Sequence, residues 1–254
     1  MIGDIVGRPG RNALLQYLPE LVQTEQVDFV IVNGENAAGG LGITPELADE
    51  LFDAGADVIT TGNHITRKPE INGYLQRSNR LLRPVNFGEK VPGVGVTLLI
   101  KDDIRYGVIN LQGTVFMDQL PNPFTAADEV LDLLVREADV IVVDFHAEAT
   151  SEKVAMGHYL DGRVTAVIGT HTHVQTNDAR ILGGGTAYLT DVGMTGPAHS
   201  IIGVDIERSM SRFVTGKYTR FILSKSDGQL NACLVVADPE SGHATAVKAI
   251  NIQP

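Results

Sequence analysis

Two histidines stand two positions apart at the end of an apolar stretch, in "AVIGTHTH" (166–173). The β-branched and apolar residues before them are typical of a buried strand. Side chains two apart in an extended chain point the same way, so His171 and His173 are expected to face one direction where the strand ends. Neutral imidazoles in this arrangement suit metal ligation, although two polar loop histidines that cap a sheet would give the same pattern. This stretch alone does not decide between the two interpretations.

Polar residues with ligand chemistry also follow the other apolar runs of the chain. They are Asp4 after "MIG", Glu35 and Asn36 after "FVIVNG", Asn63 and His64 after "VITTG", and His146 after "VIVVDF". Open α/β sheets bind ligands at the carboxyl ends of their parallel strands, where residues far apart in the sequence converge. We therefore expect these six side chains to share one cleft with His171 and His173.

Each of these residues also has an ordinary structural explanation. Asp4 could cap the following helix, Glu35 and Asn36 could form a turn, and His146 could be a core histidine. Their recurrence at the same end of successive strands favours a metal site instead. Carboxylates, amides and imidazoles without thiolates suit Fe or Mn, with Zn also compatible. The donors outnumber the needs of one ion, so the sequence predicts two divalent ions bridged by a carboxylate.

Strand and helix patterns alternate along most of the chain. The expected strands are 28–33, 56–62, 106–113, 138–145 and the run that leads to His171, and the expected helices are 44–55, 69–77, 124–138 and 150–163. Thr44 followed by Pro45 is typical of a helix start, and Thr125 with Asp128 approximates a capping box. Continuous apolar strands that alternate with helices indicate an α/β fold with a parallel sheet buried on both faces.

The two ends of the chain have a different character. After about residue 186 the pattern predicts antiparallel strands, with turns at 227–228 and 240–242. At the start, only Met1–Gly3 precedes Asp4, which predicts a weakly held edge strand or a chain whose true start lies upstream. No linker or repeat interrupts the sequence, so residues 1–254 are expected to form a single domain.

Composition narrows the class of function. The net charge of −11 argues against an extended nucleic-acid footprint, because such a surface must be basic. No apolar run is long enough to span a bilayer, which predicts no membrane partner. The single cysteine, Cys233, excludes a disulfide within the chain and is expected to be a buried apolar residue in a cytoplasmic protein. The sequence leaves a homo-oligomer open.

Read in order, the motifs resemble a known enzyme family. They are "GDIVGRPGR", "VNGENAAGG", "TGNH", "DFHAEATSEK", "GTHTHV" and "TDVGMTG". The set resembles the calcineurin-like metallophosphoesterases, in the version of the YmdB-type 2′,3′-cyclic-nucleotide 2′-phosphodiesterases. Val6 and Glu35 depart from the wider superfamily, which has a histidine and an aspartate motif there, and both match the YmdB type. The resemblance implies a calcineurin-like α/β/β/α sandwich, with two central mixed sheets flanked by helices.

The same resemblance implies roles for individual residues. One metal ion would be held by Asp4, Glu35, Asn36 and His173, and the other by Glu35, Asn63, His146 and His171. His64 resembles the catalytic histidine of the family. The implied reaction is dinuclear-metal-dependent hydrolysis of a small phosphodiester, chiefly a 2′,3′-cyclic nucleotide, by a hydroxide that bridges the ions and attacks phosphorus.

Two further residues are candidate substrate contacts. Arg8 could hold a phosphate with both arms of its guanidinium, and His199 lies in a Gly- and Pro-rich stretch of a type that often contacts substrate. The alternative function is a signalling or regulatory protein that uses the metal cleft for binding with little catalysis. A metal-dependent amidohydrolase, which also uses a His-x-His pair, is a third and less favoured hypothesis.

Overall fold

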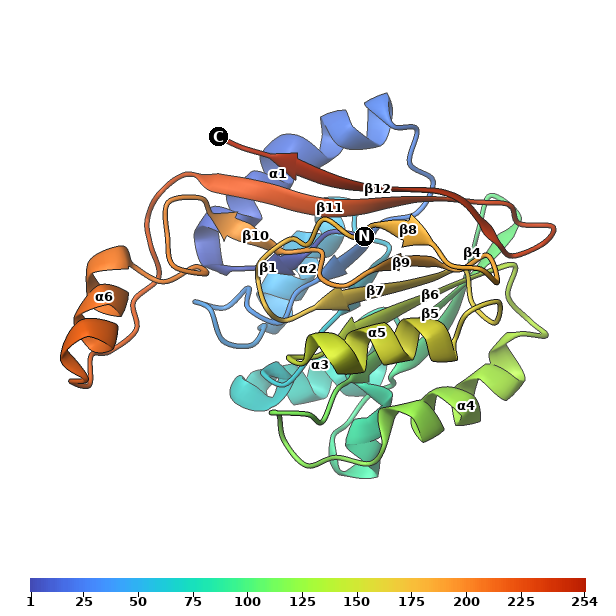
Figure 1. The fold of residues 1–254 in the computed structure, drawn as a ribbon, viewed down its shortest axis with the longest axis horizontal. Helices are drawn as coiled ribbons and strands as arrows, with labels where there is room; N and C mark the ends of the chain where they lie inside the picture. Colours follow the sequence, from blue (N-terminus) through green and yellow to red (C-terminus); the bar gives the residue numbers. More distant parts are fainter.

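The computed structural model describes residues 1–254, except for the side chain of Lys90, and contains two mixed sheets between helical layers (Figure 1). The strands are β1 (Asp4–Ile5), β2 (Ile31–Asn33), β3 (Val58–Thr60), β4 (Val96–Lys101), β5 (Ile104–Gln112), β6 (Val140–His146), β7 (Ala166–Thr170), β8 (Arg180–Ile181), β9 (Ala187–Leu189), β10 (Met194–Pro197), β11 (Gly228–Ala237) and β12 (Ala244–Ile252). The α-helices are α1 (Gly7–Thr24), α2 (Pro45–Asp53), α3 (Asn72–Arg77), α4 (Pro123–Leu134), α5 (Thr150–Tyr159) and α6 (Ile206–Thr215). Short 3-10 helices are η1 (Ile65–Arg67), η2 (Pro69–Ile71) and η3 (Val85–Lys90).

One sheet has the strand order β4-β5-β6-β7-β9-β8. Within it β5, β6, β7 and β9 run parallel. The register pairs Gln112 with His146 and His146 with Thr170, so three neighbouring strands end at one level. This alignment makes the carboxyl edge of the sheet a common platform for the loops that follow.

The other sheet joins β1-β10-β11-β12 to the β2-β3 pair through the first residues of the chain. Ile2 bridges Val32 on one side and Ala232 on the other. Its amide donates to the Ile31 carbonyl at 2.7 Å, and the Gly3 amide donates to the Asn231 carbonyl at 3.0 Å. The expectation of a weakly held edge was therefore wrong, because backbone hydrogen bonds hold this segment from both sides in mid-sheet.

Buried apolar side chains form three layers: one between the two sheets and one on the outer face of each sheet. Between the sheets lie buried residues such as Val58 and Val108 in one cluster and Ile168 and Cys233 in another. The outer face of the β2–β3 sheet is covered by α1 and α2, and that of the β5–β7 sheet by α4 and α5. Helix, sheet, sheet and helix follow one another, so the predicted α/β/β/α sandwich is confirmed.

Several local predictions are confirmed and others corrected. The Thr44 hydroxyl caps α2 by accepting from the Leu47 amide, as its sequence indicates. The expected Thr125 capping box is wrong: Asn122 caps α4 instead, because Pro123 occupies the first helical position. The stretch 69–77 is a 3-10 turn before it becomes α3.

The C-terminal prediction holds only in part. Strands β11 and β12 are antiparallel as expected, but β9 pairs in parallel with β7, and β10 pairs in parallel with β1. Strands β4 and β8 and helix α6 were not predicted, and α1 was considered only as a helix that Asp4 could cap. Within the part of the chain that the structure describes, no helix has both the length and the apolar character needed to cross a membrane.

Candidate metal centre

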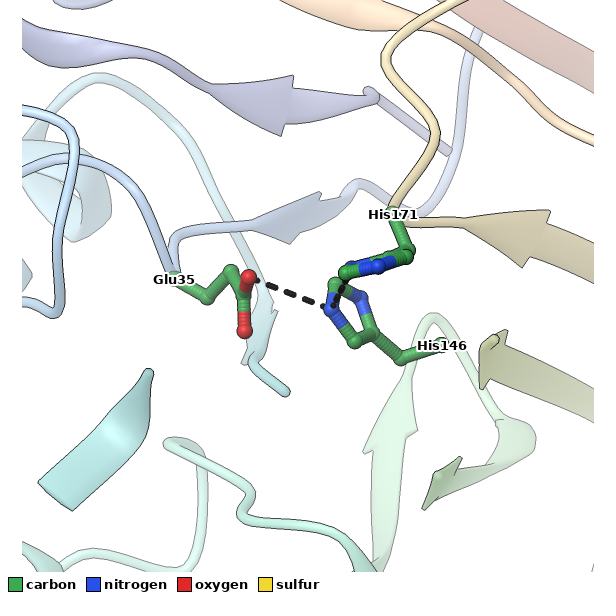
Figure 2. A group of neighbouring side chains, drawn as sticks. All are labelled: Glu35, His146 and His171. Atoms are coloured by element: carbon green, nitrogen blue, oxygen red, sulfur yellow. Dashed lines mark hydrogen bonds and ion pairs between the residues drawn. The ribbon is translucent and has the colours of Figure 1, made fainter. Parts of the chain in front are cut away.

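His146, the last residue of β6, lies at the centre of the site. Its Nε2 is 3.1 Å from three other atoms, which are Glu35 Oε1, Asn63 Oδ1 and His171 Nδ1. Figure 2 shows Glu35 and His171 converging on the His146 ring from two different loops. The donor atoms of Glu35, His146 and His171 all lie within 4.8 Å of one another. Residues from β2, β3, β6 and β7 thus meet at one point.

In His146, His171 and His173, one ring nitrogen faces an acceptor atom outside the cluster of ligand atoms. His146 Nδ1 is 2.9 Å from the Thr170 hydroxyl, which itself donates to Asp144 at 2.7 Å. His171 Nε2 is 3.1 Å from Glu148 Oε2. His173 Nδ1 is 2.9 Å from the Ile202 carbonyl. A proton on the paired nitrogen leaves the other nitrogen with a lone pair, which is the arrangement that metal-ligating histidines adopt.

His64 and Asn36 extend the cluster on the side of Glu35. His64 Nδ1 lies 3.2 Å from Glu35 Oε1 and 3.2 Å from Asn36 Nδ2. The Asn36 amide also donates to the Gly40 carbonyl at 2.9 Å, whereas its buried Oδ1 has no hydrogen-bond partner. The His146 side chain is fully buried, whereas that of His64 is 21% exposed, so His64 lies on the solvent side of the cluster.

Asp4 approaches the cluster from β1. It is fully buried; its Oδ1 has no hydrogen-bond partner, and its Oδ2 accepts from the His171 amide at 3.3 Å. The same Oδ1 is 3.9 Å from His146 Nδ1. Burial raises the pKa of Asp4, and the charge of a protonated His173 opposes this rise. An Asp4 role as a helix cap is wrong, since Val6 occupies the N-cap position of α1.

The electrostatics of the centre favour one positive charge. Burial lowers the pKa of His146, but the carboxylates of Glu35, Asp4 and Asp144 together outweigh burial and raise it to about 9. Burial opposes ionisation of Glu35 as well, yet His146 holds the pKa of that carboxyl well below its ordinary value. Burial and the charge of His146 lower the pKa of His171 to about 3. The pocket thus stabilises a cation beside Glu35 and leaves His171 neutral.

The backbone at the histidine pair is strained, and a buried ion pair holds it. His171 and His173 have φ values of 100° and 67°, which side chains with a Cβ rarely adopt. Lys153 Nζ donates to the Thr170 carbonyl at 2.7 Å and to Asp191 Oδ2 at 2.6 Å. The same Asp191 oxygen accepts from the Thr172 amide at 3.0 Å. This pair therefore fixes the chain on both sides of His171.

Gly62 leaves the space in which the cluster assembles. A Cβ at this position would lie 2.1 Å from His146 Cδ2 and 2.4 Å from Glu35 Oε2. Contacts this short do not occur between real atoms, so any side chain here would displace both residues. Position 62 must therefore be glycine, because the space beside Glu35 and His146 is too small for a Cβ.

The two expected substrate contacts lie outside the cluster. Arg8 is exposed in the first turn of α1, four residues after Asp4. His199 is exposed in the loop after β10, where its amide donates to Ser226 Oγ and its carbonyl accepts from Ser224 Oγ. The structure therefore joins Asp4, Glu35, Asn36, Asn63, His64, His146 and His171 in one network of contacts. His173 follows two residues after His171 and contacts the Ile202 carbonyl, and Arg8 and His199 lie at the surface.

A divalent ion fits the donors that are present. Glu35 Oε1, Asn63 Oδ1 and His171 Nδ1 surround His146 Nε2 at 3.1 Å, so four potential ligand atoms border one point. The unpartnered oxygens of Asp4 and Asn36 are two more buried acceptors without a donor. Buried acceptors left in this state are costly, and a cation satisfies all of them.

Several residues that shape the site were given no role from the sequence alone. They are Gly62, Asp144, Glu148, Lys153, Thr170 and Asp191. Asp144 had a usable signal, because a charged residue inside the apolar run "VIVVDF" needs buried partners. Lys153 and Asp191 stand in "TSEK" and "TDVG", but their pairing depends on tertiary contact, and one sequence cannot reveal it.

Comparisons with known proteins agree with the fold and the motifs. The model of the YmdB-like protein family matches residues 1–250. A 2′,3′-cyclic-nucleotide 2′-phosphodiesterase of Bacillus subtilis is 45% identical, and the match covers 99% of this chain and 95% of that protein. The crystal structure of a phosphatase from Mycoplasma pneumoniae superposes with a TM-score of 0.92 at 37% identity, covering 99% of this chain and 91% of the other. A 5′-nucleotidase precursor from Thermus thermophilus shares the fold, with a TM-score of 0.54 at 16% identity over 97% of this chain and 49% of its own.

Proposed function

The chain belongs to the YmdB-like protein family, and from this premise we propose that it is a metal-dependent phosphodiesterase that hydrolyses 2′,3′-cyclic nucleotides. The observation that carries the proposal is the surrounding of His146 Nε2 by three acceptor atoms at 3.1 Å. A carboxylate, an amide oxygen and two imidazoles that converge on one point are a ligand set suited to the metal ions of a phosphodiesterase. The named activity of the B. subtilis relative supports the choice of substrate.

The donors form two groups that share Glu35. The first consists of Asn63, His146 and His171, whose ligand atoms meet at His146 Nε2, 3.1 Å from Glu35 Oε1. The second consists of Asp4, Asn36 and His173, the set that the family resemblance implies, and includes the two unpartnered buried oxygens. We propose that each group holds one divalent ion, with Fe or Mn favoured and Zn compatible. When bound, two such ions supply an activated water and offset the negative charge that develops on the phosphoryl oxygens.

His64 is the proposed proton donor. In the neutral ring, the Asn36 amide donates to Nδ1 and keeps the proton on Nε2; in the doubly protonated ring, Nδ1 donates to Glu35. Only the doubly protonated ring can act as an acid, because a neutral ring that lost its proton would become an imidazolate, so the pair with Glu35 is the state suited to this role. As water adds to phosphorus and releases a proton to solvent, the bond from phosphorus to the 2′ oxygen breaks, and protonated His64 gives a proton from Nε2 to that oxygen. The product is the 3′-phosphate.

Substrate binding is proposed to involve the surface next to α1. Exposed Arg8 is suited to a phosphate oxygen, because a guanidinium offers two parallel donors. His199 stays a prediction, since its imidazole is exposed and its contacts come from its backbone. In an Arg8→Lys variant, lysine keeps the positive charge but loses the paired N–H donors. Weaker substrate binding by this variant would therefore be due to the lost donor geometry and not to the charge.

The test combines metal analysis with product identification. Protein of measured metal content is incubated with 2′,3′-cyclic AMP, 3′,5′-cyclic AMP and bis-p-nitrophenyl phosphate, with and without a chelator. We expect the 3′-phosphate from 2′,3′-cyclic AMP and loss of activity with the chelator. Negligible hydrolysis of all three by protein loaded with Mn or Fe would sink the enzymatic proposal and favour a binding or regulatory role.

Two variants then separate ligation from proton transfer. His64→Ala is expected to lower kcat by about 10²–10⁴-fold, a typical contribution of a general acid, while metal content stays unchanged. Glu35→Gln is expected to remove metal and activity together, because its carboxylate is shared by both donor groups. Loss of metal from His64→Ala would show that His64 is a ligand and that its proposed role is wrong.

A further inference from the structure

Phe116 is an exposed aromatic side chain at the carboxyl edge of the sheets. The connections that follow β2, β3, β5, β6, β7 and β10 are residues 34–44, 61–64, 113–122, 147–149, 171–179 and 198–205. Phe116 is the only Phe or Tyr in these connections, and the chain has no Trp. It is 89% exposed. A single exposed apolar residue is ordinary, so its surroundings decide whether it has a function.

The connection that carries Phe116 begins beside the metal centre. Gln112, the last residue of β5, is paired in register with His146, and the Gly113 amide donates to the His146 carbonyl at 3.0 Å. Three residues of chain reach at most about 10 Å, so the Phe116 backbone lies within that distance of Gly113. This reach is comparable to the length of a nucleotide. A nucleotide whose phosphate lies at the metal centre can therefore extend to the Phe116 ring.

Phe116 occupies a backbone position that favours glycine or asparagine. The Met117 amide donates to the Thr114 carbonyl at 3.3 Å, which closes a four-residue turn with Phe116 as its third residue. The φ of Phe116 is 62°, and a positive φ at this position is the mark of a type II turn. A phenylalanine is strained there, and because it is exposed it gains no burial in return. Strain of this kind at the edge of a site points to a functional contact.

A buried carboxylate holds the turn in place. Glu152, in the first turn of α5, is 7% exposed, and its Oε1 accepts from the Thr114 amide at 2.9 Å and from the Thr114 hydroxyl at 3.2 Å. Its Oε2 accepts from the Val115 amide at 3.2 Å. These hydrogen bonds fix the two residues before Phe116, so the ring is carried on a rigid support. A ring that is fixed in advance loses little conformational freedom when a ligand stacks on it.

The chemistry of an exposed phenyl ring selects one part of a nucleotide. The ring has no charge and no hydrogen-bonding atom, so it is not suited to the phosphate or to the ribose hydroxyl groups. A nucleobase has a flat π face, and such faces stack on aromatic side chains. Because every base has this face, stacking is expected to accept all four bases.

We propose that Phe116 binds the base of the cyclic nucleotide by stacking while the phosphate lies at the metal centre. This base contact rests on the proposed function, because it belongs to the same site. Phe116 then favours nucleotides over small phosphodiesters that lack a base, and it leaves the choice among bases open. Its contribution is to the binding of substrate, so removal of the ring is expected to change KM and not kcat.

The first experiment compares substrates with and without a base. The substrates are 2′,3′-cyclic AMP and methyl ribofuranoside 2,3-cyclic phosphate, which has a methoxy group in place of adenine. Phe116→Ala is expected to raise the KM for 2′,3′-cyclic AMP by about 5–100-fold, the loss typical of one stacked base, and to leave kcat unchanged. The KM for the compound without a base should stay the same. Phe116→Tyr keeps the ring and should behave like wild type.

Leu133→Ala is the matched control for the loss of an exposed apolar side chain. Leu133 is 73% exposed on α4 and lies outside these connections, so its substitution should change neither KM. An unchanged KM for 2′,3′-cyclic AMP in Phe116→Ala would overturn the proposal. An equal rise in KM for both substrates would overturn it as well, because the ring would then act on the metal centre and not on the base.

The second experiment detects stacking without catalysis. Because the chain has no Trp, Phe116→Trp introduces a single indole whose fluorescence reports on its own surroundings. Titration of the metal-loaded variant with adenosine 3′-phosphate, the expected product, should quench this emission, because adenine stacks on the indole. Methyl ribofuranoside 3-phosphate should not quench it. The same titrations of Leu133→Trp correct for light absorbed by the nucleotide and should show no further loss.

The outcomes separate base stacking from the phosphodiesterase activity. Hydrolysis of 2′,3′-cyclic AMP with neither a KM change in Phe116→Ala nor quenching in Phe116→Trp would overturn base stacking and leave the phosphodiesterase standing. Quenching by adenosine 3′-phosphate in a protein that hydrolyses none of the substrates would sink the phosphodiesterase and leave a nucleotide-binding site at Phe116.

Discussion

The two ends of the parallel strands carry acids in very different states. At the amino ends, Asp139 accepts from the amide and the guanidinium of Arg105 at 2.8 and 3.0 Å, and Asp57 accepts from Lys101 Nζ at 2.8 Å. At the carboxyl ends, Asp4 and Glu35 are buried among imidazoles, and Asp4 Oδ1 has no hydrogen-bond partner. Similar carboxylates are therefore paired with partly exposed Arg and Lys side chains at one edge and buried among imidazoles at the other.

These two sets of carboxylates show how an acid that stabilises the fold differs from an acid placed for function. A partly exposed carboxylate with a guanidinium or ammonium partner satisfies itself and contributes modestly to stability. A buried carboxylate whose neighbours are themselves acceptors is unfavourable until something positive binds. Substitutions at the two edges are therefore expected to have different effects.

The largest effect is expected from Gly62→Ala at the carboxyl edge. The added methyl group would lie 2.4 Å from Glu35 Oε2 and closer still to His146. Metal affinity should therefore fall by more than about 100-fold, which exceeds the loss expected when a ligand only loses a hydrogen-bond partner. Isothermal titration with Mn²⁺ measures this. In the control Gly73→Ala, the nearest atom to the new Cβ is 3.9 Å away, and α3 should gain up to about 1 kcal/mol. Wild-type affinity in Gly62→Ala would refute the tight packing of the centre.

Lys153→Met tests the buried pair that holds the histidine loop. It leaves Asp191 buried without its cation, which should lower the free energy of unfolding by about 3–5 kcal/mol. Urea unfolding of the metal-free protein gives this value. Lys101→Met at the amino edge breaks a partly exposed pair with Asp57 and should cost at most about 1 kcal/mol. Equal losses in the two variants would erase the distinction between the edges.

Thr170→Val removes the hydroxyl between His146 and Asp144. His146 then loses the acceptor that fixes its tautomer, so metal affinity should fall by about 10–100-fold. The same substitution at exposed Thr245 should leave metal affinity unchanged. If Thr170→Val binds metal like the wild type, the orientation of His146 does not depend on this chain of hydrogen bonds.

The smallest effect concerns Asp139 and pH. Hydrogen bonds from Arg105 lower the pKa of Asp139 to about 2, below the value of about 3.9 in an unfolded chain. The carboxylate therefore stabilises the fold above about pH 4, and this contribution is lost as pH falls toward 2. Asp139→Asn should flatten the dependence of unfolding free energy on pH over this range. A slope equal to that of wild type would mean that the pair with Arg105 contributes nothing.

Local sequence rules predicted much of the positioning framework. Thr44 with Pro45 starts α2, and the apolar runs that end at His146 and His171 form neighbouring parallel strands. Where the local rules gave a wrong prediction, contacts between residues distant in the sequence determined the structure. Met1–Gly3 is too short to form a strand alone, yet it lies between β2 and β11 because both neighbours offer it backbone partners.

The donor set of the site was contained in the sequence. Carboxylates, amides and imidazoles at the ends of successive apolar runs must meet at one edge once the strands are parallel, since the topology leaves them no other place. Which ring nitrogen faces inward could not be derived in the same way. That choice depends on Thr170, Glu148 and Ile202, whose contacts come from separate loops.

By itself, then, the sequence determined which residue types gather at the rim, because side-chain chemistry and strand periodicity are local properties. Only the tertiary structure decided how they are held: the volume kept open at Gly62, the strained backbone fixed by Lys153 and Asp191, and the turn at Phe116 held by Glu152. Those features arise from contacts between residues distant in the chain, and close packing, which no local pattern encodes, sets their geometry.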